Sequence, residues 1–591
     1  MIPPLNPPLN PLSPKKQDIA WVFPKENPPL VQRITREFNI NPVTAQILMS
    51  RGFTSMVEIH HYLYAKLPDL FSPSLMPQMD QAVDRLYRAI QDKESILVFG
   101  DNDVDGITGT VLLTDFFRRL GVTVFYSVPN RNQIKESIIS DAIETAVEKG
   151  CKLIITVDCG LTSTDEVERA ERYEIDVIVT DHHEPGAQNL RCVATLNPKL
   201  RNSTYPNRDL TGVGVAFKLA HALLSFLSLK GTIDPEEIDL KDMLDIVAIG
   251  TVADMGSLRG ENRILVRYGL NQIPKTGRLG LLKLLNLSDL NAETITTSDI
   301  ASKLAPRLNS LGRISDPMKG VELLLTRDFD VANTLVDFID KKNQERQKIE
   351  RRDSLEIEKM IEQHPDLLDS KAIVLFSKTC HPGIIAIIAA RLSKLYNRPT
   401  AVVTEDRGVL KASVRTIPEF PILPVLRENG DLLMNYGGHD YAAGFTIAPE
   451  NFPLFKEKFL AAADRSLSDN DLFPKLIIDA KVSFKDLTFD FLESLSLLEP
   501  FGVDNPAPTL YCEADQVFPP KMIGKVHLKF YLEEGGRQLE GIGFNLASRR
   551  HELIKKKGFR LIVAFTPTIN SYQEKTSIQL QIKDFQVLPR P

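Results

Sequence analysis

The sequence predicts an α/β protein that contains a parallel-sheet domain, a long linking helix, a smaller second α/β domain and a C-terminal β-barrel. From Ser95 onward, apolar runs of strand length such as "SILVFG", "CKLIITVDCG" and "IDVIVTDHH" alternate with helical stretches, a pattern typical of a doubly wound sheet. Some 35 residues from Asp330 to His364 contain neither proline nor glycine, which favours one long helix. After about Leu476, short strands such as "HLKFYLEE" and "SIQLQIKDFQVL" favour a small barrel.

The length of 591 residues is enough for about three or four domains of ordinary size. We expect six segments along the chain. They are a proline-rich disordered tail (1–30), an N-terminal helical segment (31–90), the first α/β domain (91–326), the connecting helix (327–364), the second α/β domain (365–465) and the β-rich domain (466–591).

The composition is that of a soluble globular protein, with 43% hydrophobic residues, 25% charged residues and a mean hydropathy of −0.12. The net charge of −6 means that a nucleic-acid partner would need a local basic channel. We expect neither a secretory signal nor a membrane span, since no apolar run approaches about 18 residues. Five widely spaced cysteines without a CxxC pair favour a reducing, cytoplasmic location and argue against a thiolate zinc site.

The stretch "VFGDNDVDGITG" places three carboxylates, Asp101, Asp103 and Asp105, at alternate positions after an apolar strand. This spacing begins like an EF-hand calcium loop, but position twelve is Leu112, where that loop requires a glutamate. The EF-hand interpretation is therefore excluded. The remaining alternatives are another metal site and a solvated acidic turn. Three carboxylates at the end of a buried strand would repel one another without a cation, which favours the metal site.

The same arrangement recurs at two further strand ends. Asp158 follows "LIITV", and Asp181, His182 and His183 follow "VIVT". The carboxyl ends of parallel strands meet at one edge of a sheet, so we expect these side chains to gather there. Carboxylate and imidazole ligands without thiolate suit Mn²⁺ or Mg²⁺, with Zn²⁺ less favoured. Asp254, at the end of "IVAIGTVAD", is a fourth candidate that alone would be an ordinary helix-end aspartate.

The adjacent pair His60 and His61 is a useful contrast, because it has helical surroundings and no aspartate nearby. We interpret that pair as structural. The histidine pair at 182–183 is distinguished by its position directly after a strand and by Asp181.

Together "DNDVDG", "VDCG", "TDHH" and "TVADM" resemble the four motifs of the DHH phosphoesterase superfamily. Within it, the chain is most similar to the RecJ family of single-strand-specific 5′→3′ DNA exonucleases. The resemblance extends from about residue 85 to the C-terminus. It includes "LTGVGVAFKLAHAL", "APRLNSLGRI", "HPGIIAIIAARL", "NYGGHDYAAGF" and "LEPFGVDNPAP".

The resemblance implies a hydrolase with two divalent ions, Mn²⁺ or Mg²⁺, that clamp the attacking and leaving oxygens of a phosphodiester. Asp101 would lie at the edge of this site, His183 close to the scissile phosphate, and Asp181 would orient the histidine pair. Water would be the nucleophile. The implied metal ligands are Asp103, Asp105, Asp158, His182 and Asp254.

The resemblance also implies a site for a 5′-phosphate, built from both α/β domains. Arginine suits this role because its planar fork binds phosphate oxygens in pairs, and glycines allow the backbone to approach a phosphate. The matching positions are Arg131, Arg307, Ser413, Arg415, Gly437, Gly438 and His439. In the OB-like C-terminal segment, Lys525, His527 and Lys529 are candidates for binding single-stranded DNA.

Three positions depart from the usual family pattern. Asn102 stands where an aromatic residue is usual, "NQIKESIIS" replaces a segment like Glu-Gly-Tyr-Gly, and "TVADMGSL" lacks an apolar-proline ending. These departures concern substrate positioning more than metal binding. Because all four acidic and histidine motifs are intact, we expect an active enzyme.

The sequence thus predicts a metal-dependent 5′→3′ exonuclease on single-stranded DNA that serves recombination and repair. One alternative is a DHH-type phosphatase or nanoRNase on short nucleotides, and another is a non-catalytic scaffold at replication complexes. By resemblance, the expected partners are the single-strand-binding protein and a helicase, and we expect a cytoplasmic monomer that contacts no membrane.

Overall fold

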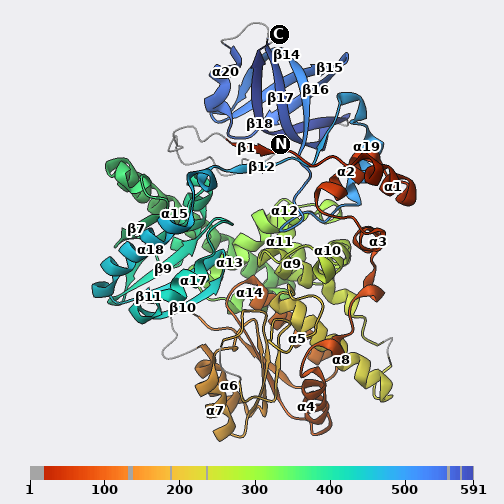
Figure 1. The fold of residues 1–591 in the computed structure, drawn as a ribbon. Helices are drawn as coiled ribbons and strands as arrows, with labels where there is room; N and C mark the ends of the chain where they lie inside the picture. Colours follow the sequence, from red (N-terminus) through yellow and green to blue (C-terminus); the bar gives the residue numbers. More distant parts are fainter. Residues whose placement is uncertain are drawn as a thin grey trace. The chain divides into compact units, whose positions relative to one another are not determined.

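The computed structural model describes residues 19–130, 138–186, 190–234, 237–554, 559–572 and 575–589. The chain folds as two compact units (Figure 1). Unit 1 contains the chain up to Ala65, Phe473–Phe501 and the chain from Asn505 onward. Unit 2 contains Lys66–Leu472 and Gly502–Asp504.

Unit 2 contains the predicted doubly wound sheet. Its five strands are all parallel and lie in the order β3-β2-β4-β5-β6. Their bounds are β2 Ile96–Gly100, β3 Val124–Ser127, β4 Leu153–Val157, β5 Asp176–Thr180 and β6 Ala194–Leu196.

Both faces of this sheet are buried, as the continuous apolar runs predict. On β2, Ile96 and Val98 belong to one hydrophobic core, while Leu97 and Phe99 belong to another on the opposite face. Figure 1 shows α6 and α7 beside the sheet, and these helices pack in the second of the two cores. One face is covered by α5 Val104–Arg119 and α8 Gly212–Leu229, with α9 Leu244–Ala253 packed against both of these helices. The other face is covered by α6 Ile138–Lys149 and α7 Thr164–Arg172.

The other elements of unit 2 that precede the second α/β domain are helical, and the last of them is the predicted long helix. Asp328 caps α15 by accepting hydrogen bonds from the amides of Asp330 and Val331, and the helix ends before Pro365. These helices are α4 Met79–Gln91, α10 Gly260–Gln272, α11 Leu279–Leu287, α12 Thr297–Asp299, α13 Ala305–Ile314, α14 Met318–Leu325 and α15 Phe329–Gln363.

The polar middle of α15, "KKNQERQKIERRD", is partly buried. Asn343, Arg346 and Asp353 are buried. The burial is possible because Arg346 donates hydrogen bonds to Asn343 Oδ1 and to Glu350, which satisfies its charge within the helix.

The second α/β domain of unit 2 has a mixed five-stranded sheet in the order β10-β11-β9-β8-β7. Only β7 and β8 run parallel; the other neighbours are antiparallel. The elements are β7 Ile373–Ser377, α16 Ile385–Tyr396, β8 Thr400–Asp406, β9 Val409–Arg415, α17 Ile422–Glu428, β10 Leu433–His439, β11 Ala442–Ile447 and α18 Phe452–Ser466.

Unit 1 contains the predicted barrel. Five strands are joined edge to edge, and a pairing between β14 and β17 closes them into a ring. The strands are β14 Leu510–Ile523, β15 His527–Glu534, β16 Arg537–Gly543, β17 Phe559–Tyr572 and β18 Lys575–Pro589, with β13 Ala480–Lys481 at the side of β14. The helices of unit 1 are α1 Pro28–Phe38, α2 Pro42–Ser50, α3 Met56–Tyr64, α19 Phe489–Ser496 and α20 Arg550–Ile554.

The N-terminal segments differ from the expected tail and single helical segment. Within residues 1–30, the described part includes strand β1 (Ala20–Val22), which pairs with β12 (Lys475–Ile477), and Trp21 Nε1 donates a hydrogen bond to Asp584 at 2.6 Å. Residues 31–90 are divided between the two units. The apolar faces of α1 to α3 share one core with the barrel strands, and this burial keeps them in unit 1.

Helix α8 is long and apolar enough to cross a membrane by length and composition, and it is the one such helix among the described residues. Its most apolar window is 61% buried inside the protein. It also carries a fully buried ion pair, Lys218 Nζ to Glu261 Oε1 at 2.5 Å, and Lys218 donates to the Phe71 carbonyl at 2.7 Å. These features are those of a core helix.

We predict that Lys218→Met destabilises unit 2 by about 3–5 kcal/mol, because it leaves the Glu261 carboxylate buried without its cation. The measurement is the urea unfolding transition of the full chain. Lys241→Met is the matched control, since Lys241 pairs with Asp239 at 3.9 Å on the exposed surface, and we expect a change within about 0.5 kcal/mol. Equal effects of the two substitutions would contradict the assignment of Lys218 to the core.

Candidate functional site

Three predicted aspartates directly follow three neighbouring strands of the parallel sheet. The backbone hydrogen bonds between neighbouring strands continue one residue past the end of each strand. The amides of Asp101, Asp158 and Asp181 donate to carbonyls of the neighbouring strand at 2.9–3.0 Å. Their side chains therefore start from one edge of the sheet, as the sequence predicts. All three are buried, with exposed fractions of 8%, 3% and 1%.

The loop after β2 turns directly into α5. Asp103 caps this helix, and its Oδ1 accepts hydrogen bonds from the amides of Asp105 at 3.0 Å and Gly106 at 3.2 Å. A Cβ atom added at Gly106 would lie 2.3 Å from the Asp101 carbonyl oxygen, so only glycine fits this tight return of the chain.

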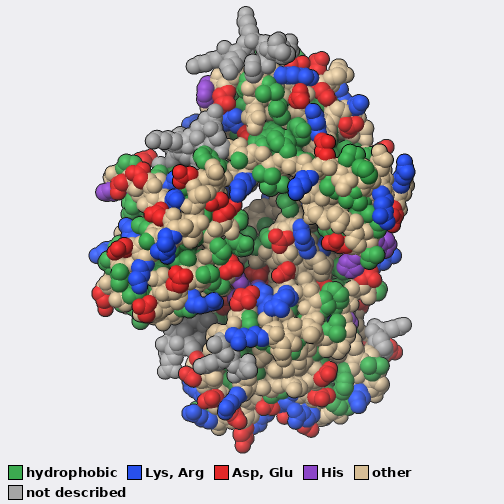
Figure 2. All heavy atoms as spheres, in the orientation of Figure 1, with side chains coloured by type: hydrophobic (Ala, Val, Ile, Leu, Met, Phe, Trp, Pro, Cys, Tyr) green, Lys and Arg blue, Asp and Glu red, His purple; other side chains and the backbone are tan. Residues whose placement is uncertain are grey.

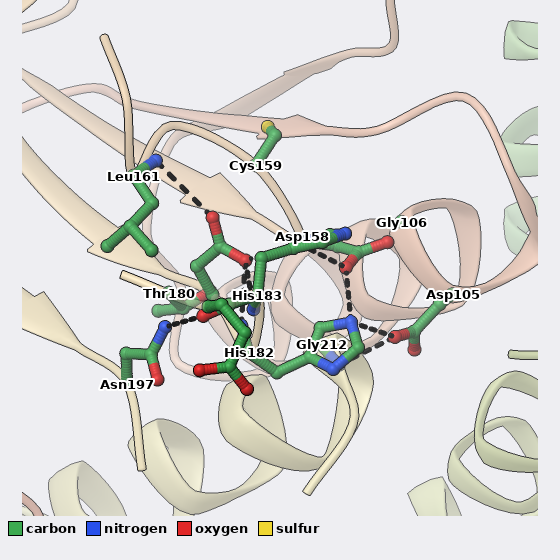
Figure 3. A network of polar contacts seen from close by, with 12 residues as sticks. Asp105, Gly106, Asp158, Cys159, Leu161, Thr180, His182, His183, Asn197 and Gly212 are labelled. Carbon is green, nitrogen blue, oxygen red and sulfur yellow. Dashed lines mark hydrogen bonds and ion pairs between the residues drawn. The ribbon is translucent and has the colours of Figure 1, made fainter. Parts of the chain in front are cut away.

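The N-terminus of α8 holds the carboxylate of Asp105. The Gly212 amide donates to Asp105 Oδ2 at 2.6 Å, and the Val213 amide donates to Oδ1 at 2.8 Å. In Figure 3, Asp105 points toward Gly212 and His182. A Cβ atom added at Gly212 would lie 2.6 Å from the Cβ atom of Asp158, so this contact also requires glycine. The positive end of a helix dipole favours the negative charge here.

His182 lies among three carboxylates. Its Nε2 is 3.0 Å from Asp158 Oδ1, 3.6 Å from Asp254 Oδ2 and 3.9 Å from Asp105 Oδ2 (Figure 3 shows Asp158 and Asp105). Asp254 reaches the group from the C-terminal cap of α9.

Three sets of side chains can each bring ligand atoms within 4.8 Å of one another. Asp158 belongs to two of the sets, so its carboxylate lies between neighbouring candidate cation positions. The sets are Asp101, Asp103 and Asp158; Asp105, His182 and Asp254; and Asp158, His182 and His183.

The donor chemistry fits a divalent cation. Asp158 Oδ1 is buried and accepts no hydrogen bond from any residue that the structure describes. Burial and the neighbouring carboxylates raise the pKa of Asp158 and of Asp254 well above the usual value, and raise that of Asp105 to about 7. Burial also lowers the pKa of His182, which favours the neutral imidazole that binds metals. A cation would offset this crowding of negative charge.

His183 is held by Asp181. His183 Nδ1 lies 2.7 Å from Asp181 Oδ1, and that oxygen also accepts hydrogen bonds from the amides of His182 and His183. Burial opposes both charges, but this pairing lowers the pKa of Asp181 to about 2 and raises that of His183 to about 9. Asn197, after β6, donates to the His183 carbonyl at 2.9 Å and fixes the backbone of the pair.

The second α/β domain contributes His439 to the same place. The rings of His439 and His183 are stacked, with centroids 5.2 Å apart and planes inclined by 12°. Burial and the nearby His183 lower the pKa of His439 to about 4. The predicted residues His182, His183 and His439 are therefore brought together from two sheets.

Ser413, Arg415 and Gly437 lie on the same face of the second sheet as His439. The strand register places Gly437, Gly444 and Ser413 in one row across β10, β11 and β9, and His439, Ala442 and Arg415 in the next. The residues between them are small, and a Cβ atom added at Gly437 would meet no atom within 4 Å, although Ser413 itself is 7% exposed. We call this surface the open face of the second sheet. Arg415 donates to Ser413 Oγ at 3.1 Å, and burial lowers the pKa of its guanidinium.

Gly438, the residue between these two rows, has a φ of 130°, a value that side chains disfavour. A Cβ atom added there would lie 2.4 Å from the Ala442 carbonyl oxygen. The close pairing of β10 and β11 next to His439 therefore requires glycine.

The structure describes one of the two remaining predicted phosphate-binding residues. Arg307, on α13, contacts Asp340 at 3.3 Å and the Lys303 carbonyl at 2.8 Å. Arg131 lies outside the described residues.

The three predicted DNA-binding residues of the barrel lie in unit 1. Lys525 is exposed, His527 accepts a hydrogen bond from the Asn545 amide, and Lys529 pairs with Glu540 at 2.9 Å. The ammonium groups of Lys521 and Lys529 also lie 5.6 and 5.3 Å from the centre of the Tyr531 ring.

Sequence reasoning missed the residues that support the site through the backbone or from a distance, namely Gly212, Val213, Asn197 and Asn309. Asn197 lies in "LNPK", and Gly212 and Val213 lie in "LTGVGVAF". The small residues "TG" at the start of an apolar helix were the available signal that a helix N-terminus could bind a negatively charged group.

Three family models match the chain in the order of its domains. They are the DHH family N-terminal domain at residues 95–251, the DHHA1 domain at 369–465 and the RecJ OB domain at 478–584. A single-stranded-DNA-specific exonuclease RecJ of Bacillus subtilis is 34% identical over 96% of this chain and 70% of its own length. The Escherichia coli protein of the same name is 32% identical over 95% of this chain and 96% of its own length.

The chain belongs to the RecJ family. A crystal structure of RecJ from Thermus thermophilus in complex with Mn²⁺ has a similar fold, with a TM-score of 0.81 and 28% identity over 96% of this chain and 79% of that chain. A structure of the same RecJ with Mg²⁺ gives a TM-score of 0.73, with 26% identity over 96% of this chain and 78% of that chain.

We predict that Asp158→Asn raises the melting temperature of the EDTA-treated protein at pH 8. When folding raises the pKa of a carboxyl group, the folded protein favours the protonated form of that group. Its contribution to the free energy of unfolding is therefore full below the ordinary pKa and is lost as the pH rises through the raised pKa. For Asp105 this loss takes place between pH 3.8 and about pH 7. The pKa of Asp158 is also raised, so its contribution is likewise lost as the pH rises. Asparagine removes the charge and tolerates the φ of 62° at this position.

The control for this prediction is Glu168→Gln, an exposed position on α7, where we expect no change in melting temperature. A lower melting temperature of Asp158→Asn in EDTA would contradict the repulsion among the crowded carboxylates.

Proposed function

We propose that this protein is a metal-dependent exonuclease that hydrolyses phosphodiester bonds of single-stranded DNA. The observation that carries the proposal is the position of Asp158 in two neighbouring sets of ligand atoms at the edge of the parallel sheet. The names of the RecJ relatives support the substrate. The closed barrel and the length of the chain favour this function over a phosphatase or nanoRNase for short nucleotides. The intact ligand sets favour it over a non-catalytic scaffold.

The proposed cofactor is a pair of Mn²⁺ or Mg²⁺ ions, and the kind of ion is supported by the solved RecJ complexes, one with Mn²⁺ and one with Mg²⁺. Asp158 would bridge the two positions. Such ions lower the pKa of bound water and stabilise negative charge on the oxygens of the reacting phosphate. Asp103, with Asp101 at the edge, would hold one position beside Asp158. At the other, His182 lies 3.0 Å from Asp158 Oδ1 and also belongs to the set with Asp105 and Asp254, which would complete that position.

The chain's own residues orient the reaction. Asp181 holds Nδ1 of His183, which leaves Nε2 of that ring to donate a hydrogen bond to a phosphate oxygen. The stacked ring of His439 limits the rotation of His183 and keeps water from one side of it. The amides of Gly212 and Val213 fix the rotamer of Asp105 before any ligand binds, which is a preorganised arrangement.

The open face of the second sheet is the proposed site for the 5′-terminal phosphate. Ser413 and Arg415 lie in adjacent rows with Gly437 and His439, so a phosphate over the small residues would meet a hydroxyl, a guanidinium and accessible backbone. Occupation of this face by the 5′ end places the first phosphodiester over the candidate metal site and gives the 5′→3′ direction. Arg131 and Arg307 stay proposals for the same role.

The barrel is proposed to bind single-stranded DNA. Phe518 and Tyr531 contact each other edge to face, and Lys521 and Lys529 flank Tyr531, a combination of rings and cations that suits stacked bases. Lys525 lies in the turn between β14 and β15, and His527 is the first residue of β15, the strand that carries Tyr531. Acidic and basic side chains are interspersed over the face seen in Figure 2, so DNA binding would depend on local patches of this kind rather than on net charge.

The cellular setting follows from the family resemblance. We propose a cytoplasmic, monomeric enzyme of recombination and repair that contacts no membrane. A helicase would supply unwound ends to it, and the single-strand-binding protein would present the strand.

We predict that the wild-type protein with Mn²⁺ releases short products from the 5′ end of single-stranded DNA, and that Asp158→Ala reduces this activity to background. The bridging carboxylate is lost in the variant while the helices around it remain. The measurement uses oligonucleotides labelled at either end, with a blunt duplex as the control substrate. Initial release from the 3′ end, or equal degradation of the duplex, would sink the proposed function.

We predict that Arg415→Lys and Arg415→Ala each raise the KM for 5′-phosphorylated DNA, by about tenfold for Ala, and reduce kcat less. Loss of one bidentate phosphate contact removes roughly 1.5–3 kcal/mol of binding. The control is Arg465→Ala, an exposed arginine on α18 of the same domain. An equal loss of activity on DNA with and without a 5′-phosphate would argue against this role.

A further inference from the structure

The loop that carries Asp101, Asp103 and Asp105 is held from outside by helix α13. The Val104 amide donates to Asn309 Oδ1 at 3.2 Å, and Asn102 Nδ2 lies 3.5 Å from the Gly312 carbonyl oxygen in a long hydrogen bond. Asn102 itself is 4% exposed. The contacts of α13 thus fall on residues 102 and 104, which alternate with the three aspartates.

Gly312 is the closest point of this contact. A Cβ atom added there would lie 2.2 Å from the Asn102 carbonyl oxygen and 3.4 Å from Asn102 Cγ. The backbone of α13 therefore rests directly on the loop. The short amide side chain of Asn102, which replaces the aromatic residue usual in the family, lies against the same glycine.

The next residue of α13 contacts the second α/β domain just as closely. A Cβ atom added at Gly383 would lie 2.5 Å from the Arg313 carbonyl oxygen, and Arg313 Nη1 donates to the Gly383 carbonyl at 2.9 Å. The amide of Gly383 donates to His381 Nδ1, which holds Gly383 to its neighbours in the second α/β domain. The His381 amide in turn donates to Asp353 of α15.

We propose that α13 is a positioning element that couples the place of the second α/β domain to the conformation of the aspartate loop. Backbone contacts at residues 102 and 104 restrain the orientation of the aspartates between and beside them. The reason is that each rigid peptide plane joins two successive residues of the loop. A displacement of Gly383 would pass through Arg313 and Gly312 to Asn102. This inference rests on the proposed function for its meaning, since the loop is the one assigned to metal binding.

The proposal makes Gly312, Gly383 and Asn309 positioning residues, although none of them belongs to a ligand set. Packed backbone of this kind transmits displacement because it cannot compress. When the 5′ end of DNA is bound on the open face, the second α/β domain would be held in place. It would then keep the aspartate loop in the geometry that binds cations. DNA binding and cation binding would each favour the other.

The test compares Mn²⁺ binding by isothermal titration calorimetry and the melting temperature in EDTA for full-length variants. Gly312→Ala presses on the loop directly, and Gly383→Ala presses on Arg313 from the second domain. The matched control is Gly320→Ala on the neighbouring α14, where an added Cβ would meet only side-chain methyl groups of Ile107 and Leu311 at 3.2–3.5 Å. Asn309→Ala removes the acceptor for the Val104 amide, and Asn309→Asp retains one.

We expect Gly312→Ala and Gly383→Ala to weaken Mn²⁺ binding by about five- to tenfold, with Gly320→Ala unchanged. Asn309→Ala should weaken binding and Asn309→Asp should restore it, which a merely structural role of this residue would not produce. Should Gly312→Ala not fold, Gly383→Ala and the Asn309 pair decide the question. Wild-type Mn²⁺ affinity in Gly383→Ala, or equal losses in both Asn309 variants, would overturn the coupling.

The same experiment separates this inference from the proposed function. If the wild-type protein binds Mn²⁺ but does not degrade single-stranded DNA, the proposed function fails, while the order of Mn²⁺ affinities among the variants still tests the coupling.

Discussion

The two backbone amides at the start of α8 that hold the Asp105 carboxylate are the interaction on which the site depends. Asp105 is almost fully buried and lies beside Asp158 and His182, so its charge could not be kept there without strong donors. A helix N-terminus supplies both the donors and a favourable dipole without a competing cationic side chain. Each oxygen of the carboxylate accepts one of these hydrogen bonds, which leaves a further lone pair on each oxygen for a divalent ion.

This constraint explains the glycines around the site. Gly212 brings the first turn of α8 against Asp158, and Gly106 lets the loop return under Asp101. Either side chain would separate the carboxylates that the sheet edge collects. The parallel sheet supplies the common edge, since β2, β4 and β5 all end there, and the second domain adds His439 and the open face that leads to Arg415.

The strand-end aspartates and the histidine pair could be predicted from the sequence, because their positions follow from local periodicity. The long helix α15 was predictable for a similar reason, since nothing in its 35 residues interrupts it. The Asp105–Gly212 contact could not be predicted, because 107 residues separate the partners and a backbone amide has no residue type to mark it.

Other differences have the same physical origin. Strand β1 forms because Trp21 and its neighbours find partners near the far end of the chain, and Asp584 is 563 residues from Trp21. The burial within the charged middle of α15 could not be predicted, because the sequence does not tell which polar side chains will satisfy one another, as Arg346 and Asn343 do. Local pattern gives the elements and the chemistry of the ligands, whereas long-range packing decides how rigidly those ligands are held.

The central claim is that the sheet edge holds two divalent cations that share the Asp158 carboxylate. The most direct measurement is an anomalous difference map, at the manganese absorption edge, from crystals grown with Mn²⁺. We expect two peaks about 3.5–4 Å apart on either side of Asp158, one near Asp103 and one near His182. A single peak, or two peaks that do not share Asp158, would contradict it.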